Sequence, residues 1–249
     1  MNMEVGKEKI IYLMDGIDIQ LPIRQYMNLE YLYQLLGTKR YFLRRKQYFE
    51  DMAEKKPPLK TVFSLFTPHI VGTGIMDEKQ YQKEKKELHE LISKLQDAKN
   101  LPTSCWTKRN NENYLMWKAY APDNGVCIKS TIYNFMASFI EDDYQIICGE
   151  ISYNNYKGLR TIDDYLFSKH SFYSNEEEIR FYFDKQDNEE QELTDEHVYI
   201  KVDPSVLIDE IILSPFMDDK NVYKAITIVH NNYNCRINKS LVSIKRKQL

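Results

Sequence analysis

The stretch 177–184 constrains the fold most, because apolar and polar side chains alternate strictly along it. The two faces of a β-strand receive alternate side chains, so this pattern predicts a strand with one face in a hydrophobic core. Charged side chains would then line the opposite face. The apolar positions are Ile179, Phe181 and Phe183, and the polar ones are Glu178, Arg180 and Tyr182.

The remaining elements are predicted from periodicity and from turn and capping residues. Asn28 and Gly37 fit the two ends of one helix, and Asp77 opens another whose apolar stripe reaches Leu95. Strands and helices mix without regular strand–helix–strand alternation, which favours an α+β fold. Further strands are expected at 10–14, 21–26, 39–43, 126–129, 145–153, 197–202, 207–213 and 240–245, and further helices at 114–120, 162–170 and 219–232.

Bulk composition limits the classes of protein to consider. The chain has 249 residues and a net charge of −3, which gives no broad field for binding polyanions. It has four cysteines without a CxxC pair and five scattered histidines, so we expect no metal site. The absence of a long apolar run predicts no membrane contact and a cytoplasmic location. We expect one domain over 1–249, with an acidic insertion at about 184–196.

The strongest chemical signal is the run that contains Glu176, Glu178 and Arg180. On a strand, residues two apart lie on one face, roughly 6.5–7 Å from each other. Neighbouring carboxylates raise each other's pKa, whereas a guanidinium holds a carboxylate ionised. A carboxylate held in this way is suited to accept a hydrogen bond from a ribose hydroxyl or to stabilise an oxocarbenium-like centre. A solvated strand face with a salt bridge is the alternative, which the spacing alone favours.

Two further clusters each have two interpretations. Trp117 and Tyr120 are three residues apart on a short helix, where they would hold a nicotinamide or adenine ring, or else belong to an aromatic core stripe. The segment 39–49 holds five basic and four aromatic residues, a composition typical of single-stranded nucleic-acid contacts. Alternatively, its rings are core and its charges are solvated. The candidate nucleic-acid contacts are Lys39, Arg40, Tyr41, Arg44, Arg45 and Lys46.

The order of motifs over about 20–245 resembles a broad bacterial family described as a domain of unknown function. An Arg-x-Tyr strand is followed by a Ser-x-Trp strand, then a Met-Trp-x-x-Tyr helix before a Gly-Val-x-Ile strand. A Lys and a Phe then precede Glu-x-Glu-x-Arg, and Ile-x-Glu-Ile-Ile stands before a Pro. The matching residues are Arg24, Tyr26, Ser104, Trp106, Met116, Trp117, Tyr120, 125–128, Lys169, Phe172, Glu176, Glu178, Arg180, 208–212 and Pro215.

The layout of that family in turn resembles the ADP-ribosyltransferase superfamily. The resemblance implies two packed mixed or antiparallel sheets with flanking helices, and NAD bound in the cleft between the sheets. Many members of the first family carry His in place of Arg24, and Ser130-Thr131 competes with Ser104 for the middle motif. The implied catalytic residues are Glu178, Glu176 and Arg24, and the implied NAD contacts are Arg24, Tyr26, Ser104, Trp117, Tyr120 and Arg180.

The resemblance therefore implies an NAD-dependent ADP-ribosyltransferase. Together with the basic-aromatic segment, it favours nucleic acid as the acceptor, single-stranded RNA above others. By analogy with enzymes of bacterial conflict, we expect a toxin of an antiphage toxin–antitoxin system, with an antitoxin as its partner. A non-enzymatic RNA-binding module and an NAD glycohydrolase remain as alternatives.

Overall fold

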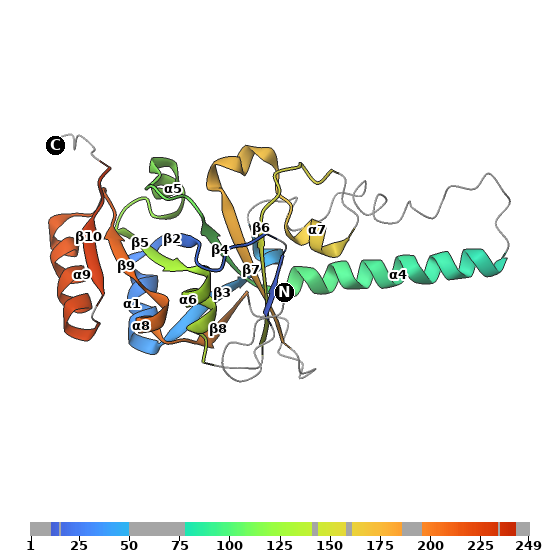
Figure 1. The fold of residues 1–249 in the computed structure, drawn as a ribbon, viewed down its shortest axis with the longest axis horizontal. Helices are drawn as coiled ribbons and strands as arrows, with labels where there is room; N and C mark the ends of the chain where they lie inside the picture. Colours follow the sequence, from blue (N-terminus) through green and yellow to red (C-terminus); the bar gives the residue numbers. More distant parts are fainter. Residues whose placement is uncertain are drawn as a thin grey trace.

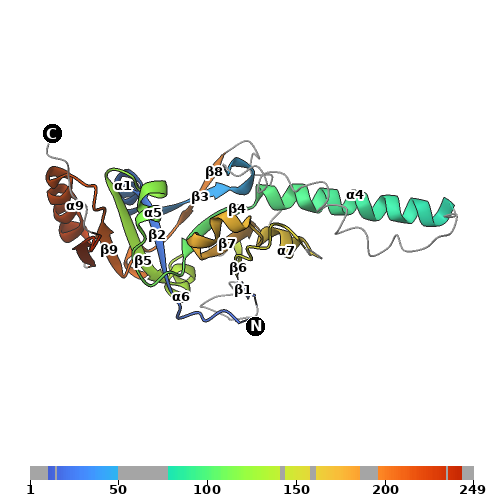
Figure 2. The same ribbon diagram turned by 90° about the horizontal axis from the view of Figure 1, so that it is seen from above.

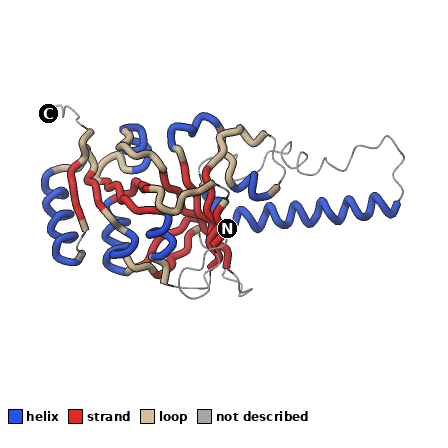
Figure 3. The backbone as a smooth tube through the Cα atoms, in the orientation of Figure 1, coloured by secondary structure: helices blue, strands red, loops and turns tan. Residues whose placement is uncertain are grey.

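A computed structural model describes residues 11–14, 16–49, 78–140, 144–157, 161–185, 196–233 and 235–242. Its described strands form one connected ten-stranded mixed sheet, in which most neighbours are antiparallel (Figures 1 and 3). The strands are β1 (Ile11–Leu13), β2 (Pro22–Asn28), β3 (Arg40–Arg45), β4 (Pro102–Thr107), β5 (Gly125–Thr131), β6 (Tyr144–Glu150), β7 (Glu178–Lys185), β8 (His197–Lys201), β9 (Glu210–Leu213) and β10 (Arg236–Lys239).

Helices cover both faces of this sheet. One face packs on the main core, to which α1, α6, α8 and α9 contribute, and the other carries α5 and α7. The helix α4 projects from the body (Figure 2), and its described buried side chains, Leu95 and Ala98, lie near its C-terminal end. The helices are α1 (Leu29–Thr38), η1 (Lys46–Tyr48), α4 (Glu78–Asn100), α5 (Tyr114–Tyr120), α6 (Ile132–Ala137), α7 (Ile162–Leu166), η3 (Ser171–Glu176), α8 (Pro204–Leu207) and α9 (Asp219–Asn232).

The alternation of β7 is confirmed. Ile179, Phe181 and Phe183 belong to the main core, while Tyr182 packs in a separate cluster on the opposite face. Phe135 of α6 packs on Phe181 with ring centroids 4.4 Å apart. This tight apolar contact fixes which way β7 faces, so the polar positions must point to the other side of the sheet.

The sheet forks at β4. This strand pairs with β7 along residues 103–107, but its other edge pairs with β3 at Thr103 and with β2 at Thr107. The Gln25 side chain bridges the gap, because its Nε2 donates to the Cys105 carbonyl 3.1 Å away. One branch continues through β2, β5, β9 and β10, and the other through β3 and β8. The two packed sheets that the resemblance implies are here branches of one hydrogen-bonded sheet.

Several boundaries differ from the prediction. The helix α1 runs through Gly37 to Thr38, and its C-cap Lys39 adopts a left-handed conformation with φ 53°. Residues 204–207 form α8, because Asp203 caps a turn that Pro204 begins. The C-terminal strand β10 lies at 236–239 rather than 240–245, and α7 ends at Leu166. Asp77, most of the acidic insertion and residues 243–245 lie outside the described residues.

The parallel pairing of β9 and β10 extends the sheet on the far side of the fork. Among the described helices, none has the length and apolarity that a bilayer crossing requires.

We predict that Gly125→Ala destabilises the fold by about 1–3 kcal/mol or more, because an added Cβ would lie 2.2 Å from the Ala121 Cβ and 2.8 Å from its Cα. Gly37→Ala is the matched control, since no heavy atom lies within 4 Å of the position that its added methyl group would take. Gly37 lies in the last turn of α1, where that change should be neutral or stabilise by at most about 1 kcal/mol. Urea unfolding of both variants measures the difference, and equal stabilities would contradict the packing described for β5.

Candidate active site

The centre of the site is a buried ion pair on β7. Glu178 and Arg180 are 2% and 0% exposed. The Arg180 Nε donates to Glu178 Oε1 at 2.6 Å, and its Nη2 donates to Oε2 at 3.1 Å. A bidentate pair of this kind fixes both the position and the plane of the carboxylate. The arrangement follows from the strand, which places residues two apart on one face.

Lys169 joins the second carboxylate to this pair. Its Nζ donates to Glu178 Oε2 at 3.1 Å and to Glu176 Oε2 at 2.7 Å. Glu176 ends η3, and the left-handed Glu177 separates it from the strand. The prediction that Glu176 shares the strand with Glu178 is therefore wrong, although the two carboxylates do meet the same ammonium group. The Tyr120 hydroxyl donates to Glu176 Oε1 at 2.6 Å, which connects α5 to the cluster.

The electrostatic surroundings keep Glu178 charged. Burial alone would raise the pKa of its carboxyl group, but Arg180 and Lys169 outweigh burial and lower the pKa to about 2. Burial and the carboxylate of Glu176 raise the pKa of the Tyr120 hydroxyl, so this hydroxyl stays a hydrogen-bond donor. The cluster thus presents one permanently ionised carboxylate at a fixed position.

The face of β4 that meets this cluster carries Cys105 and Thr107, which pair in register with Arg180 and Glu178. Burial, and then the Glu178 carboxylate, raise the pKa of the Cys105 thiol well above its usual value, so the thiol stays protonated. The predicted Ser104 points to the other side of β4, where it is buried but still contributes to the lining of the larger of the two cavities described below. Its Oγ is within hydrogen-bond distance of the Tyr41 hydroxyl (2.7 Å), and it accepts from Trp106 Nε1 (2.9 Å). Ser104 therefore connects β4 to β3 at the fork.

A cavity of about 410 Å³ opens at the fork above the ion cluster. Such a volume suits a small-molecule ligand. Arg24 and Arg44 both contribute to its lining, and each has a buried nitrogen, Nη1 and Nε respectively, with no hydrogen-bond partner among the described residues. The positive charges of these two guanidinium groups make this part of the lining suited to an anionic ligand.

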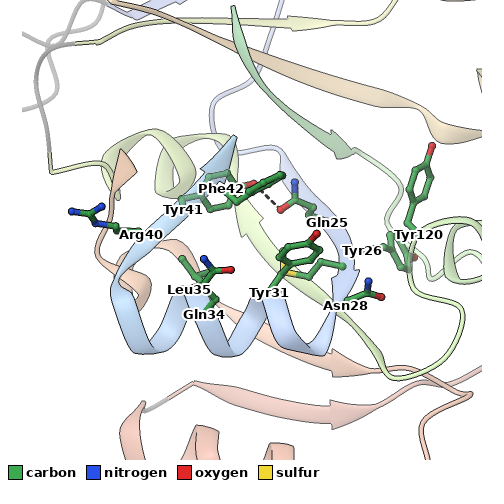
Figure 4. Close-up of a pocket in the computed structure, with 11 residues that line it drawn as sticks. Gln25, Tyr26, Asn28, Tyr31, Gln34, Leu35, Arg40, Tyr41, Phe42 and Tyr120 are labelled. Carbon is green, nitrogen blue, oxygen red and sulfur yellow. Dashed lines mark hydrogen bonds between the residues drawn. The ribbon is translucent and has the colours of Figure 1, made fainter. Parts of the chain in front are cut away.

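A second cavity of about 210 Å³ adjoins the first, and Gln25, Tyr26, Phe42 and Tyr120 line both. Figure 4 shows Gln25 bonded to the Tyr41 hydroxyl in this cavity. Residues of β2 and β3, the strands that begin the two branches, line both cavities, and β4 contributes to the larger one. The fork itself is thus the origin of the cleft.

Trp117 lies elsewhere than predicted. It is fully buried, does not line either cavity, and meets the ring of Tyr26 edge to face at 4.8 Å. Its Nε1 donates to Glu112 at 3.0 Å. Trp117 therefore supports Tyr26, whereas Tyr120 on the same helix faces the cavities. The competing pair Ser130-Thr131 also lies away from the cavities, since Thr131 caps α6.

The basic-aromatic segment is divided between core and surface. Tyr41, Arg45 and Lys46 are 3%, 5% and 0% exposed. Arg45 Nη1 donates to the Asn100 carbonyl at 2.7 Å, and Lys46 Nζ lies 4.4 Å from the centre of the Tyr165 ring. These three side chains do not present a surface to nucleic acid, which corrects that part of the prediction. Lys39, Arg40 and Arg44 remain accessible to solvent.

Three residues that position the site were not among the predicted site residues. Lys169 bridges the carboxylates, Gln25 spans the fork, and the Tyr153 hydroxyl accepts from the Glu178 backbone N–H at 2.9 Å. Lys169 had a sequence signal, because it begins the motif that ends in Glu-x-Glu-x-Arg. Within the described ranges, no group of three or more His, Cys, Asp or Glu side chains is arranged to hold a metal ion.

We predict that the ion cluster makes the free energy of unfolding depend on pH below about 4.5. A carboxyl group whose pKa falls from 4.5 to about 2 on folding stabilises the protein fully above pH 4.5 and loses this contribution as the pH falls toward 2. The loss should be on the order of 3 kcal/mol. Carboxyl carbon NMR of the wild type would follow the titration directly, and a Glu178 resonance that titrates near 4.5 would contradict the assignment.

Glu178→Gln should cost about 3–5 kcal/mol at pH 7, because it leaves buried cations without their partner. Glu177→Gln is the control, since its ion pair with Arg109 is partly exposed and should contribute at most about 1 kcal/mol. Urea unfolding at neutral pH compares the two neighbours.

No protein-family profile matches the sequence, and no curated protein matches it. The solved structures with a low structural similarity to this chain include two of DarT from Thermus sp. 2.9. The complex with ADP-ribosylated single-stranded DNA has a TM-score of 0.37 and 9% identity, covering 88% of this chain and 94% of that one. The complex with NAD+ has a TM-score of 0.37 and 10% identity, covering 90% and 97%.

Proposed function

We propose that the protein is an NAD-dependent ADP-ribosyltransferase that uses the cleft at the fork of the sheet. The observation that carries the proposal is the charge arrangement of one cavity. Its lining holds the carboxylates of Glu176 and Glu178, together with Arg24 and Arg44, each of which has a buried nitrogen without a described partner. NAD has matching features, because its diphosphate is anionic and its nicotinamide ribose becomes cationic as the glycosidic bond breaks.

The proposed step breaks the bond between nicotinamide and the ribose, and the electron pair leaves with nicotinamide. The ribose carbon then bonds to an acceptor nucleophile, which loses a proton. Glu178 supports this step through a negative charge whose position is fixed before the reaction, and such preorganised charge stabilises an oxocarbenium-like centre. Arg180 and Lys169 keep that charge in place.

The position of Glu176 suits a contact with the acceptor nucleophile. Its Oε1 accepts from Tyr120 and its Oε2 from Lys169, and a carboxylate can accept about four hydrogen bonds in all. Its side chain is 14% exposed, compared with 3% for Glu178. We therefore assign to Glu176 the orientation of the attacking group or the acceptance of its proton.

The acceptor that we propose is nucleic acid, RNA above others, and the accessible residues of the basic-aromatic segment, Lys39, Arg40 and Arg44, support this choice. A role as a toxin with an antitoxin partner remains a proposal from the sequence. Two other functions have distinct signatures in the same assay. An NAD glycohydrolase would consume NAD without labelling an acceptor, and a non-enzymatic RNA-binding module would bind RNA and ignore NAD.

We expect purified protein to transfer label from NAD to a nucleic acid, and Glu178→Gln and Glu176→Gln each to reduce transfer by about 10²–10⁴. Label should be followed with single-stranded RNA, single-stranded DNA and protein acceptors in separate reactions. Glu176→Gln is the more informative variant, because it leaves the Glu178–Arg180 pair intact.

Glu177→Gln controls for the loss of one carboxylate from the same segment and should transfer normally. Each variant is first checked by thermal unfolding, so that a misfolded sample is not scored as inactive. A folded Glu176→Gln and a folded Glu178→Gln that both transfer at the wild-type rate would refute the mechanism.

We also predict that Arg24→Ala weakens NAD binding by about 10- to 150-fold, because a hydrogen bond to a charged group contributes about 1.5–3 kcal/mol. Arg236→Ala, an exposed position on β10, is the matched control. The increase in melting temperature with NAD measures affinity, since a ligand of the native state stabilises it. Equal shifts for both variants would place the diphosphate away from Arg24.

A further inference from the structure

The outer face of the β3–β8 arm carries aromatic and basic side chains in register. Phe42 lies opposite Tyr199, with Arg40 opposite Lys201 on one side of this pair and Arg44 opposite His197 on the other. The alternate residues Leu43 and Val198 are buried in the main core, so the arm cannot turn this face inward. We call the face the β3–β8 platform; it consists of Arg40, Phe42, Arg44, His197, Tyr199 and Lys201, with Tyr31 of α1 beside it.

The rings of the platform form one continuous group. Phe42 is 5.5 Å from Tyr31 in a stacked arrangement, 5.1 Å from His197 and 5.8 Å from Tyr199. Tyr31 is 46% exposed, which is unusual for a ring held in such a cluster. Figure 4 shows Tyr31 and Phe42 side by side at the smaller cavity. Flat rings held rigidly at a surface offer stacking faces to planar ligands.

The described residues of this region carry more positive than negative charge, although the chain as a whole is slightly acidic. Lys39, Arg40, Arg44 and Lys201 lie on or next to the two strands. Among the described residues, nearby carboxylates include Glu196, which binds Arg44 at 2.7 Å, and Asp203, which accepts from Ser205. Cations beside stacking rings are the combination that binds single-stranded nucleic acid, since cations meet phosphates and rings meet bases.

We propose that the β3–β8 platform binds a single strand of nucleic acid and leads it to the mouth of the cleft. This inference rests on the proposed function for its purpose, but binding by the platform is independent of it. Phe42 lines both cavities, and Arg44 lines the larger one together with Glu176. A nucleotide stacked on the platform therefore lies next to the cavity in which the acceptor is needed. His197, Tyr199 and Lys201 were not part of the predicted segment.

The test is binding by the full chain without NAD, which separates it from the transferase assay. Fluorescence anisotropy would use labelled strands of about 12 nucleotides, as RNA, as DNA of the same sequence and as the DNA duplex. We expect at least one of the single strands to bind more tightly than the duplex. RNA above DNA, or the reverse, identifies the preferred sugar, and either order supports the proposal.

Tyr199→Ala should weaken single-strand binding by roughly 5- to 150-fold through loss of stacking, and Tyr199→Phe should restore most of it. Lys201→Ala should lower the slope of log affinity against log salt by about 0.7, the value for one phosphate contact. Tyr223→Ala is the matched control, because this tyrosine is 75% exposed on α9, away from the platform.

The proposal is overturned if folded wild-type protein binds no single strand at about 50 mM salt, or if the duplex binds as tightly. It also fails if Tyr223→Ala weakens binding as much as Tyr199→Ala. Thermal unfolding of each variant shows that it is folded, and Tyr199→Phe and Lys201→Ala keep the test usable should Tyr199→Ala not fold. Binding of a single strand without NAD-dependent transfer would support the proposal for the platform and contradict the proposed transferase function.

Discussion

The contact on which the site depends is the buried pair of Glu178 and Arg180. Arg180 also donates through Nη1 to the Leu166 carbonyl at 3.2 Å, so the same guanidinium holds the end of α7. The Glu178 backbone N–H binds the Tyr153 hydroxyl, which ties the segment after β6 to the cluster. Lys169 completes the group and draws η3 inward through Glu176. The pair and its neighbour Lys169 therefore connect three loop-rich segments, two of which also pair with each other at the Ser152–Ser168 bridge.

The fork of the sheet has a complementary role. A strand that loses its neighbour exposes backbone groups, and these must be satisfied by other donors and acceptors. Gln25 supplies one of them at β4, and its own oxygen accepts from the Tyr41 hydroxyl at 2.6 Å. The Tyr41 hydroxyl also lies 2.7 Å from the Ser104 Oγ. This short polar chain allows the sheet to separate into two branches and leaves a cleft beside the ion cluster.

Local patterns in the sequence predicted the orientation of β7, because alternation depends on neighbours two residues away. They did not predict which distant residues meet there. Tyr120 and Glu176 are 56 residues apart, and nothing in their local sequences indicates that they bond. Glu176 was predicted on the strand because the Glu-x-Glu spacing fits a strand, whereas the left-handed Glu177 breaks it. The cluster nevertheless contains both carboxylates, since Lys169 reaches each of them.

The segment 39–49 shows a second limit of local sequence. Buried and solvated cations look alike in a sequence, because long side chains can bury their stems and find polar partners. Lys46 does so completely, with its Nζ between the Tyr182 hydroxyl and the Tyr165 ring. Alternation along β3 does predict that Arg40, Phe42 and Arg44 share a face, but it carries no information on β8. The platform becomes visible once the pairing of these two strands is known.

The surroundings of the ion cluster bear on the catalytic role proposed for it. Replacing a buried ion pair by apolar side chains of similar volume is often neutral or stabilising, so stability alone does not explain charges at this position. Here the pair lies in the lining of a cavity, and two cations keep Glu178 ionised where burial would otherwise neutralise it. A fixed charge beside a ligand cavity is costly to build and useful for a charged transition state. The position of the cluster, more than its strength, therefore supports a catalytic role.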